Sequence, residues 1–250
     1  MTQPKASAPG PRVALFITCL TDQFFPRVGV AVTKILEHFG CEVFFPREQT
    51  CCGQPMFNNG FPVEAGELAR RWVEIFKPYE YVVTPSGSCC SMVREHYPQL
   101  LDGSDVPGRT YEFVEFLEKV LKVDVSGISL PQSRKVAYHY TCHLRGLGIE
   151  PRPPRILREM GNVQMMELER ADQCCGFGGT FAVKYPVVSG AIVEDKTDCI
   201  ARSGAETLVC NDAGCTMNIA GMCRRRGMET RVVHLAELMA EGMGIDLDKW

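Results

Sequence analysis

A duplicated cysteine module constrains this chain more than any other feature of its sequence. Cys51 lies 32 residues after Cys19. Cys174 follows Cys142 at the same distance. Each of the second cysteines is followed by Cys-Gly, so three cysteines and a glycine repeat at an offset of 123 residues. Because four such matches seldom coincide by chance, the chain is interpreted as two copies of one unit.

The similarity between the copies extends over most of the sequence. The string VALFITC in the first copy aligns with VAYHYTC in the second. Further on, TPSGSC ends at Cys89 and CNDAGC ends at Cys215, which adds a fourth cysteine to each copy. RTYEFVEFLEKVL and RVVHLAELMAEGM then align near the end of each unit. The duplication therefore covers nearly the whole chain.

The alignment also predicts the domain boundaries. The seam between the copies falls at SGISLPQSR, which is interpreted as a linker at residues 126–134. We expect a first cysteine-rich module at residues 12–125 and a second at residues 135–250. Residues 1–11, MTQPKASAPGP, lack the apolar run of a signal peptide and are expected to form a disordered tail.

Strand-like and helix-like patterns alternate within each copy. In the first copy they are, in chain order, VALFIT, GVAVTKILEHFG, CEVFF, AGELARRWVEIF and YVV. The second copy repeats this order. Such alternation predicts an α/β fold with two pseudo-symmetric modules, each built of βαβ units around a parallel sheet. Each cysteine cluster then follows the carboxyl end of a strand, where the ligands of such sheets gather.

Composition argues against several other classes of protein. The net charge is −3, with 27 Lys and Arg against 30 Asp and Glu, so no basic face is expected for nucleic acid or anionic lipid. No run of about 18 apolar residues predicts a membrane span. We therefore expect a cytoplasmic protein, in which the 13 cysteines stay reduced unless a metal binds them.

The repeated cysteines are interpreted as metal ligands. The first proposed site holds Cys19, Cys51, Cys52 and Cys89, and the second holds Cys142, Cys174, Cys175 and Cys215. Four thiolates suit either an iron–sulfur cluster or a zinc ion. The adjacent Cys-Cys pair favours the cluster, because several irons offer separate binding points whereas two neighbouring residues seldom both reach one small ion. Zinc remains the alternative.

The other cysteines receive different interpretations. Cys41 and Cys199 are read as small buried hydrophobic residues, and Cys223 as incidental. Cys90 and Cys210 have no counterparts in the opposite copy, so each is a candidate fifth ligand.

Two further polar residues lie beside Cys142. His143 is a candidate donor of a hydrogen bond to a cluster or substrate. Arg145 is the one candidate for binding a substrate carboxylate. No Ser-His-Asp set, Walker loop or HExxH pattern appears, so no catalytic residue is assigned.

These motifs resemble the cysteine-rich domains of heterodisulfide reductase and of the glycolate oxidase iron–sulfur subunit. The longer strings CLTDQFFP, CCGQPMFNNG and CCGFGGTFAVK are similar to the lactate utilization protein A family, over roughly residues 12–243. This resemblance implies an iron–sulfur electron-transfer subunit of a cytoplasmic L-lactate oxidising complex that needs no nicotinamide. It implies a ferredoxin-like protein B and a protein C as partners, and thus an oxidoreductase subunit.

The chain departs from the heterodisulfide reductase pattern at one position in each module. That pattern ends each module in Cys-x-x-Cys and supplies five ligands to a non-cubane cluster. Here Ser86 and Asp212 replace the earlier of these two cysteines. With four ligands left, the resemblance implies a 4Fe-4S cluster, one or two per chain. A heterodisulfide or thiol reductase and a zinc-stabilised assembly module remain the alternatives.

Overall fold

The computed structural model describes residues 10–101, 106–149 and 151–249, and most of the predicted tail at residues 1–11 lies outside them. Two four-stranded sheets form the frame, and every strand pair in them is parallel. Among the described helices, none combines the length and the hydropathy needed to cross a bilayer.

The first half contains one sheet and the helices between its strands. Its elements are β1 (Arg12–Leu15), α1 (Cys19–Phe24), α2 (Pro26–His38), β2 (Glu42–Phe44), α3 (Gln54–Asn58), α4 (Pro62–Phe76), β3 (Tyr81–Thr84), α5 (Gly87–Ser91), a π-helical turn (Met92–His96), α6 (Tyr97–Leu100), a 3₁₀ turn (Val106–Arg109), β4 (Thr110–Glu112) and α7 (Phe113–Lys119).

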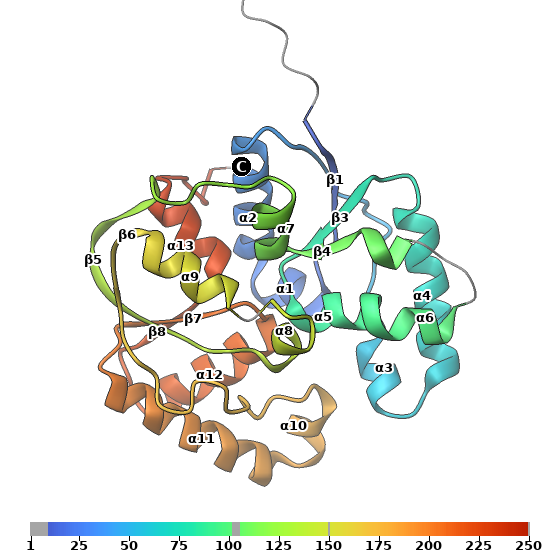
Figure 1. Cartoon of the computed structure of the whole chain (residues 1–250). Coiled ribbons are helices and arrows are strands. Elements are labelled where there is room, and N and C mark those ends of the chain that lie inside the picture. The colour runs from blue at the N-terminus through green and yellow to red at the C-terminus, as the bar shows by residue number, and fades with distance from the viewer. Residues whose placement is uncertain (1–9, 102–105, 150, 250) are drawn as a thin grey trace, which may run out of the picture.

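The second half repeats this arrangement. Its elements are β5 (Ser129–Tyr138), α8 (Cys142–Gly146), α9 (Arg152–Glu159), β6 (Gly161–Met165), α10 (Thr180–Lys184), α11 (Pro186–Ser203), β7 (Thr207–Cys210), α12 (Ala213–Arg225), β8 (Arg231–His234) and α13 (Leu235–Gly242). Figure 1 places the first half, blue to green, beside the second, yellow to red.

The two sheets have the same topology. The strand order is β2-β1-β3-β4 in the first and β6-β5-β7-β8 in the second. Corresponding long helices also begin alike, since α4 starts at Pro62 and α11 at Pro186. Proline fits the first turn of a helix because the backbone N–H that it lacks would have no partner there. The predicted α/β fold of two pseudo-symmetric modules with parallel sheets is confirmed.

The segment between the halves is more ordered than a linker. β5 begins at Ser129, inside the predicted linker at residues 126–134, and Ser129 pairs with Gly161 of β6. A bulge then shifts the register before Arg134. Residues 129–134 therefore belong to the second sheet, and the exact module boundaries stay a prediction.

One hydrophobic core joins the two halves. The helix that follows the fourth strand of each half packs on the other half, α13 against α2 and α7 against α9. Leu238 and Met239 of α13 lie in the same buried cluster as Ile35 and Leu36 of α2. Each half also keeps a smaller core of its own. Because the main core is shared, neither half can lose its partner without exposing apolar surface.

The shared core predicts that damage in the second half destabilises the first. We expect Leu238→Ala to lower the free energy of unfolding by about 2–5 kcal/mol, because Leu238 is buried and its loss leaves a cavity. Unfolding is followed by the fluorescence of Trp72 in a Trp250→Phe background, which reports on the first half alone. Leu238→Met is the matched control. An unchanged Trp72 transition in Leu238→Ala would contradict the shared core.

Candidate metal centres

All eight predicted ligands follow the carboxyl ends of strands, as the sequence predicts. Cys19 and Cys142 begin α1 and α8, just after β1 and β5. The Cys-Cys-Gly segments follow β2 and β6. Cys89 and Cys215 lie in the first turns of α5 and α12, after β3 and β7. All thirteen cysteines are free, and none forms a disulfide.

The four thiols of the first site form a row. The Sγ atoms of Cys19 and Cys51 are 3.6 Å apart, and those of Cys52 and Cys89 are 3.4 Å apart. A hydrogen bond between Cys51 and Cys52 joins the two pairs. Among the described residues, no three of these sulfurs lie within 4.8 Å of one another. The row runs from the exposed Cys19 to the buried Cys52 and Cys89.

The second site has a similar row with one difference. The Sγ atoms of Cys175 and Cys215 are 3.1 Å apart, and Cys174 is hydrogen bonded to Cys175. Cys142, however, contacts Nδ1 of its neighbour His143 at 3.6 Å rather than another thiol. Cys142 and Cys174 are exposed, whereas the other two cysteines are buried.

One cysteine in each site is disposed to ionise. Hydrogen bonds from Cys19 and Cys52 lower the pKa of Cys51 to about 3. A hydrogen bond from His143 lowers the pKa of Cys142. Hydrogen bonds within the rows raise the pKa of Cys52 and Cys174. Each row therefore has one sulfur that readily becomes a thiolate, the form that binds metal.

The glycine after each cysteine pair has a positive φ, 84° at Gly53 and 80° at Gly176. A Cβ at Gly176 would lie 2.8 Å from the carbonyl oxygen of Ser189. Ser189 also donates a hydrogen bond from Oγ to the carbonyl of Gly176, at 2.8 Å. Only glycine fits this turn without strain, which explains the third position of the Cys-Cys-Gly motif.

Ser86 and Asp212, which stand where the related pattern has a fifth cysteine, bind each other across the two halves. Ser86 Oγ donates to Asp212 Oδ2 at 3.2 Å. The same oxygen accepts from the backbone N–H of Ser88 at 3.0 Å, while Oδ1 accepts from that of Gly214 at 3.0 Å. One buried carboxylate thus bonds the amino-terminal turns of α5 and α12 together. These positions act as helix caps.

A second set of caps crosses the junction nearby. Glu112 caps α7 and accepts from Nδ2 of Asn211 at 3.2 Å, while burial raises the pKa of Glu112 to about 7. His234 occupies the position of Glu112 in the second half, and its Nδ1 caps α13. Its Nε2–H donates to the carbonyl of Pro85, in the first half, at 3.0 Å. The two sites are therefore held at the junction by paired contacts from both halves.

The residues next to Cys142 lie between the sites. His143 Nε2 is 3.3 Å from the amide nitrogen of Gln54, which also donates to the carbonyl of Ser88 at 3.3 Å. Gln54 follows the first Cys-Cys-Gly segment directly, so the two cysteine rows are neighbours across the junction. Arg145, the residue predicted to bind a substrate carboxylate, instead forms an ion pair with Asp172 at 3.3 Å.

The remaining cysteines are all buried. Burial raises the pKa of both Cys90 and Cys210. Cys90 is hydrogen bonded to Arg94, and Cys210 to Thr216. Neither candidate fifth ligand is bonded to a thiol of the two rows. The buried positions of Cys41 and Cys199 agree with their interpretation as small core residues. Cys223, which was interpreted as incidental, is buried as well.

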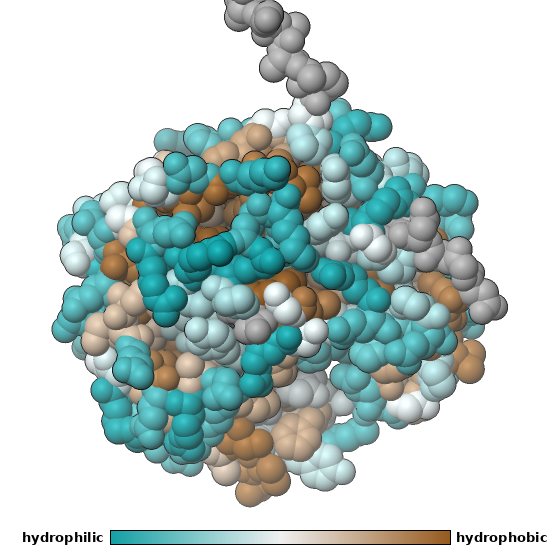
Figure 2. Space-filling model, in the orientation of Figure 1, coloured by the Kyte–Doolittle hydropathy of each residue, from teal (hydrophilic) through white to brown (hydrophobic). Residues whose placement is uncertain are grey.

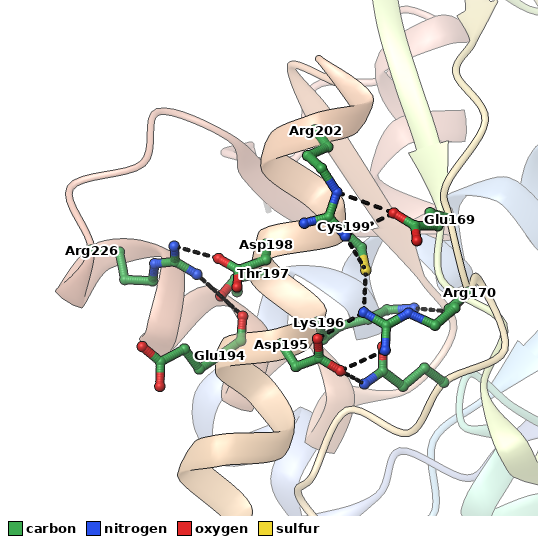
Figure 3. A network of polar contacts seen from close by, with 11 residues as sticks. Glu169, Arg170, Glu194, Asp195, Lys196, Thr197, Asp198, Cys199, Arg202 and Arg226 are labelled. Carbon is green, nitrogen blue, oxygen red and sulfur yellow. Dashed lines mark hydrogen bonds and ion pairs between the residues drawn. The ribbon is translucent and has the colours of Figure 1, made fainter.

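A polar network anchors the loop that leads to Cys174. Figure 3 shows Arg170 of this loop paired with Asp195 of α11, at 2.7 and 2.8 Å. Lys196, also on α11, is completely buried, and its Nζ donates to the carbonyls of Arg170 and Ala171 at 3.0 Å. The guanidinium of Arg170 also contacts the sulfur of Cys199 at 3.2 Å. The network fixes the backbone just before the second Cys-Cys-Gly segment.

Sequence reasoning missed one residue of the second site. His139, on the strand side of Cys142, is buried, and a ring nitrogen lies within 4.8 Å of the sulfurs of Cys175 and Cys215. Burial, and then the charge of Lys196, lower its pKa to about 3. The signal was present in the repeat, because the offset of 123 residues places His139 over Phe16. A polar residue at a position that is apolar in the other copy marks a difference between the sites.

Exposed apolar side chains flank both centres at equivalent positions. Phe61 and Val63, at the start of α4, are 51% and 68% exposed. Tyr185 and Val187, at the start of α11, are 58% and 84% exposed. Figure 2 shows hydrophobic residues gathered at the lower edge of the molecule, over the start of α11. Asn59 connects the two regions through Thr180, at 2.7 Å.

The repeated fold and its two thiol rows define a protein of the cysteine-rich CCG class. Residues 13–94 and 136–220 each match the family described as cysteine-rich domain, CCG. Lactate utilization protein A of Exiguobacterium sp. is 45% identical over 93% of this chain and 98% of its own length. The same protein of Geobacillus kaustophilus is 42% identical over 91% of this chain and 98% of its own length. The chain belongs to the lactate utilization protein A family.

Solved structures add no argument about function. A glutamate racemase from Francisella tularensis aligns with a TM-score of 0.36 and 9% identity, over 94% of this chain and 80% of that one. Because this TM-score and identity are so low, only the relatives found by sequence are informative about this chain.

The caps at the junction predict separate roles for Asp212 and the cysteines. We expect Asp212→Ala to lower the free energy of unfolding by about 1–3 kcal/mol, because two helix termini lose their acceptor. Metal bound per folded chain stays unchanged, since Asp212 is not a ligand. Denaturant unfolding and metal analysis of the same preparation measure both effects, with Asp212→Asn as the matched control. Loss of metal from folded Asp212→Ala would make the aspartate a ligand instead.

Proposed function

We propose that this chain is an iron–sulfur electron-transfer subunit of an L-lactate oxidising system. The observation that carries the proposal is the pair of four-cysteine rows, adjacent across one junction and each ending in exposed sulfur. Two neighbouring redox centres in one chain suit the passage of electrons. No residue of the described chain is assigned to chemistry on lactate itself.

The donor set fits an iron–sulfur cluster better than a single zinc ion. Four thiolates around zinc, at about 2.3 Å from the metal, would all lie about 3.8 Å apart. In the first site two sulfur pairs are this close, but no three sulfurs lie within 4.8 Å of one another. The row does not surround a single zinc position, and a core with several irons, each taking one thiolate, would spread the paired sulfurs along the same row on binding. With four cysteines per site, we propose a 4Fe-4S cluster in each half.

When bound, such a cluster gains and loses one electron at a time. The chain's own residues supply the environment. Cys52, Cys89, Cys175 and Cys215 are buried and hold the protein side of each centre, whereas Cys19, Cys142 and Cys174 bring the other side to the surface. The contact between Gln54 and His143 joins the two centres through hydrogen bonds. An electron can therefore enter at one exposed edge and leave at the other.

The lactate connection rests on the relatives, which bear the name lactate utilization protein A. The structure supports a role apart from the substrate. A cavity of about 410 Å³ beside α2 is lined by apolar residues such as Val30 and Phe45, by the acidic Asp22 and Glu37, and by Lys34, whose Nζ donates to the backbone carbonyls of Asp246 and Lys249. A lactate carboxylate needs a free cation, and Arg145 is already paired with Asp172. We assign lactate oxidation to a partner.

The partners proposed from the family resemblance are a ferredoxin-like protein B and a protein C, in the cytoplasm. The exposed apolar residues at the starts of α4 and α11 flank both centres and offer a surface for such a partner. An interface with apolar side chains at its centre would exclude water from the path of the electron. The chain's own clusters would then exchange electrons with those of protein B.

The structure gives less support to the alternatives. A heterodisulfide or thiol reductase with the five-ligand cluster needs a cysteine where Ser86 and Asp212 form caps. A zinc-stabilised module needs four sulfurs around one point, which the first row does not provide.

The proposal predicts the metal content of ligand variants. We expect anaerobically purified protein to contain iron and acid-labile sulfide. Cys52→Ser and Cys175→Ser should each lose about half of both, because each removes a thiolate from one centre. Cys223→Ala is the matched control, since Cys223 is equally buried but lies outside both rows. Iron and sulfide analysis and the visible absorption spectrum measure the result.

Two outcomes would contradict the proposal. Folded wild-type protein that binds zinc but neither iron nor sulfide would favour the assembly module. Turnover of a disulfide substrate by the isolated chain, abolished in Cys175→Ser, would favour the reductase.

A further inference from the structure

His139 is a buried polar residue that lacks a well-formed hydrogen bond. It is 1% exposed, and neither ring nitrogen meets the distance and angle of a hydrogen bond among the described residues. The one backbone group that acts on the ring is Ala171, whose carbonyl already accepts from Nζ of Lys196 and from the N–H of Tyr140. Because buried polar groups nearly always have a full partner, the imidazole of His139 is available to a further ligand.

The surroundings of the ring identify what kind of partner fits. A ring nitrogen of His139 and the sulfurs of Cys175 and Cys215 all lie within 4.8 Å of one another. Among the described residues, this is the only trio of potential metal ligands that is so compact. All three residues are buried, so bulk water does not compete for the site. Imidazole and thiolate are both preferred ligands of zinc and iron.

Packing alone does not require a histidine at this position. The equivalent Phe16 packs edge-on against Trp72 and Phe76, with ring centroids 5.7 and 5.5 Å away. Counted from the prolines that begin the equivalent helices α4 and α11, Trp72 corresponds to Lys196 in the second half. The first site is therefore backed by hydrocarbon, and the second by an imidazole and an ammonium. The polar groups appear on the side of the sheet that faces Cys175 and Cys215.

The cations near His139 leave its lone pair available. Arg145 and Lys196 are the charged groups that act on the ring, and both are positive. Each is held elsewhere, Arg145 by Asp172 and Lys196 by two backbone carbonyls. Neither cation is hydrogen bonded to the imidazole, so neither blocks the ring nitrogens.

We propose that His139 is a nitrogen ligand of the second metal centre in place of one of the two exposed cysteines, which makes that centre a mixed cysteine–histidine site while the first remains all-cysteine. In the iron–sulfur form this inference rests on the proposed function. The compact trio by itself also offers a binding site for a single divalent cation such as Zn²⁺. One chain would thus carry two centres of different ligand chemistry on the same repeated fold.

Zinc binding to apo-protein tests the ligand set without relying on iron. In a Cys52→Ser background, which disables the first site, we expect X-ray absorption of the zinc-loaded protein to detect nitrogen at about 2.0–2.1 Å beside sulfur at about 2.3 Å. His139→Phe, which copies the first half, should remove the nitrogen signal and weaken zinc binding at least tenfold. His38→Gln, an exposed histidine, is the matched control. An all-sulfur zinc site in the His139-containing protein would overturn the proposal.

A second measurement addresses the iron form. Protein labelled with ¹⁵N-histidine is reduced without oxygen, and pulsed electron paramagnetic resonance should detect a nitrogen coupled to the second centre that is absent in His139→Phe. If His139→Phe fails to fold, His139→Cys keeps a ligand at the position and should bind metal while losing the nitrogen signal. A cluster with no histidine coupling would overturn the assignment. Absence of iron and sulfide in the wild type would instead refute the proposed function, and the zinc experiment would still decide on His139.

Discussion

The carboxylate of Asp212 is the contact on which the arrangement of the two centres depends. It is 7% exposed and accepts hydrogen bonds from Ser86 and Ser88 of one half and from Gly214 of the other. A buried carboxylate is tolerated only where several donors satisfy it, and here the donors come from the helix termini that carry Cys89 and Cys215. One side chain therefore sets the position of a ligand in each half. The position that serves as a ligand elsewhere has become the joint between the halves.

Duplication produced two equivalent scaffolds, and the residues behind the cysteines have since diverged. The first site is backed by Phe16 and Trp72, and the second by His139 and Lys196. An ammonium held in a low-dielectric interior stabilises negative charge on nearby groups. Lys196 gives the second row a buried basic neighbour that the first row lacks, although burial lowers the pKa of its amine. In the proposed function, this difference would make the reduction potentials of the two centres unequal.

The sequence predicted the parts of the structure that repeat. The 32-residue spacing and the alternation of strands and helices placed all eight cysteines correctly at strand ends, because parallel strands bring their carboxyl ends to one edge. The contacts between the two halves could not be predicted from the sequence. Ser86 and Asp212 were recognised as missing ligands, but their mutual bond depends on how two modules pack. Residues 129–134 were read as linker because the string SLPQSR is mostly polar and contains a proline, although β5 is an inner strand of its sheet. His139 was overlooked because it was read as part of a strand rather than compared with Phe16.

The gradient of exposure along each row explains how one small chain can both protect and connect its centres. The inner sulfurs of Cys52 and Cys175 are 2% and 5% exposed, which limits access of oxygen and water to that side. The outer sulfurs of Cys19 and Cys142 lie at the surface, on helices that begin where β1 and β5 end. Because α5 and α8 are in contact at the junction, the protected sides are set by the same packing that holds the halves together. The stability of the fold and the geometry of both cysteine rows therefore depend on one interface, and a change that loosens the junction would alter both rows at once.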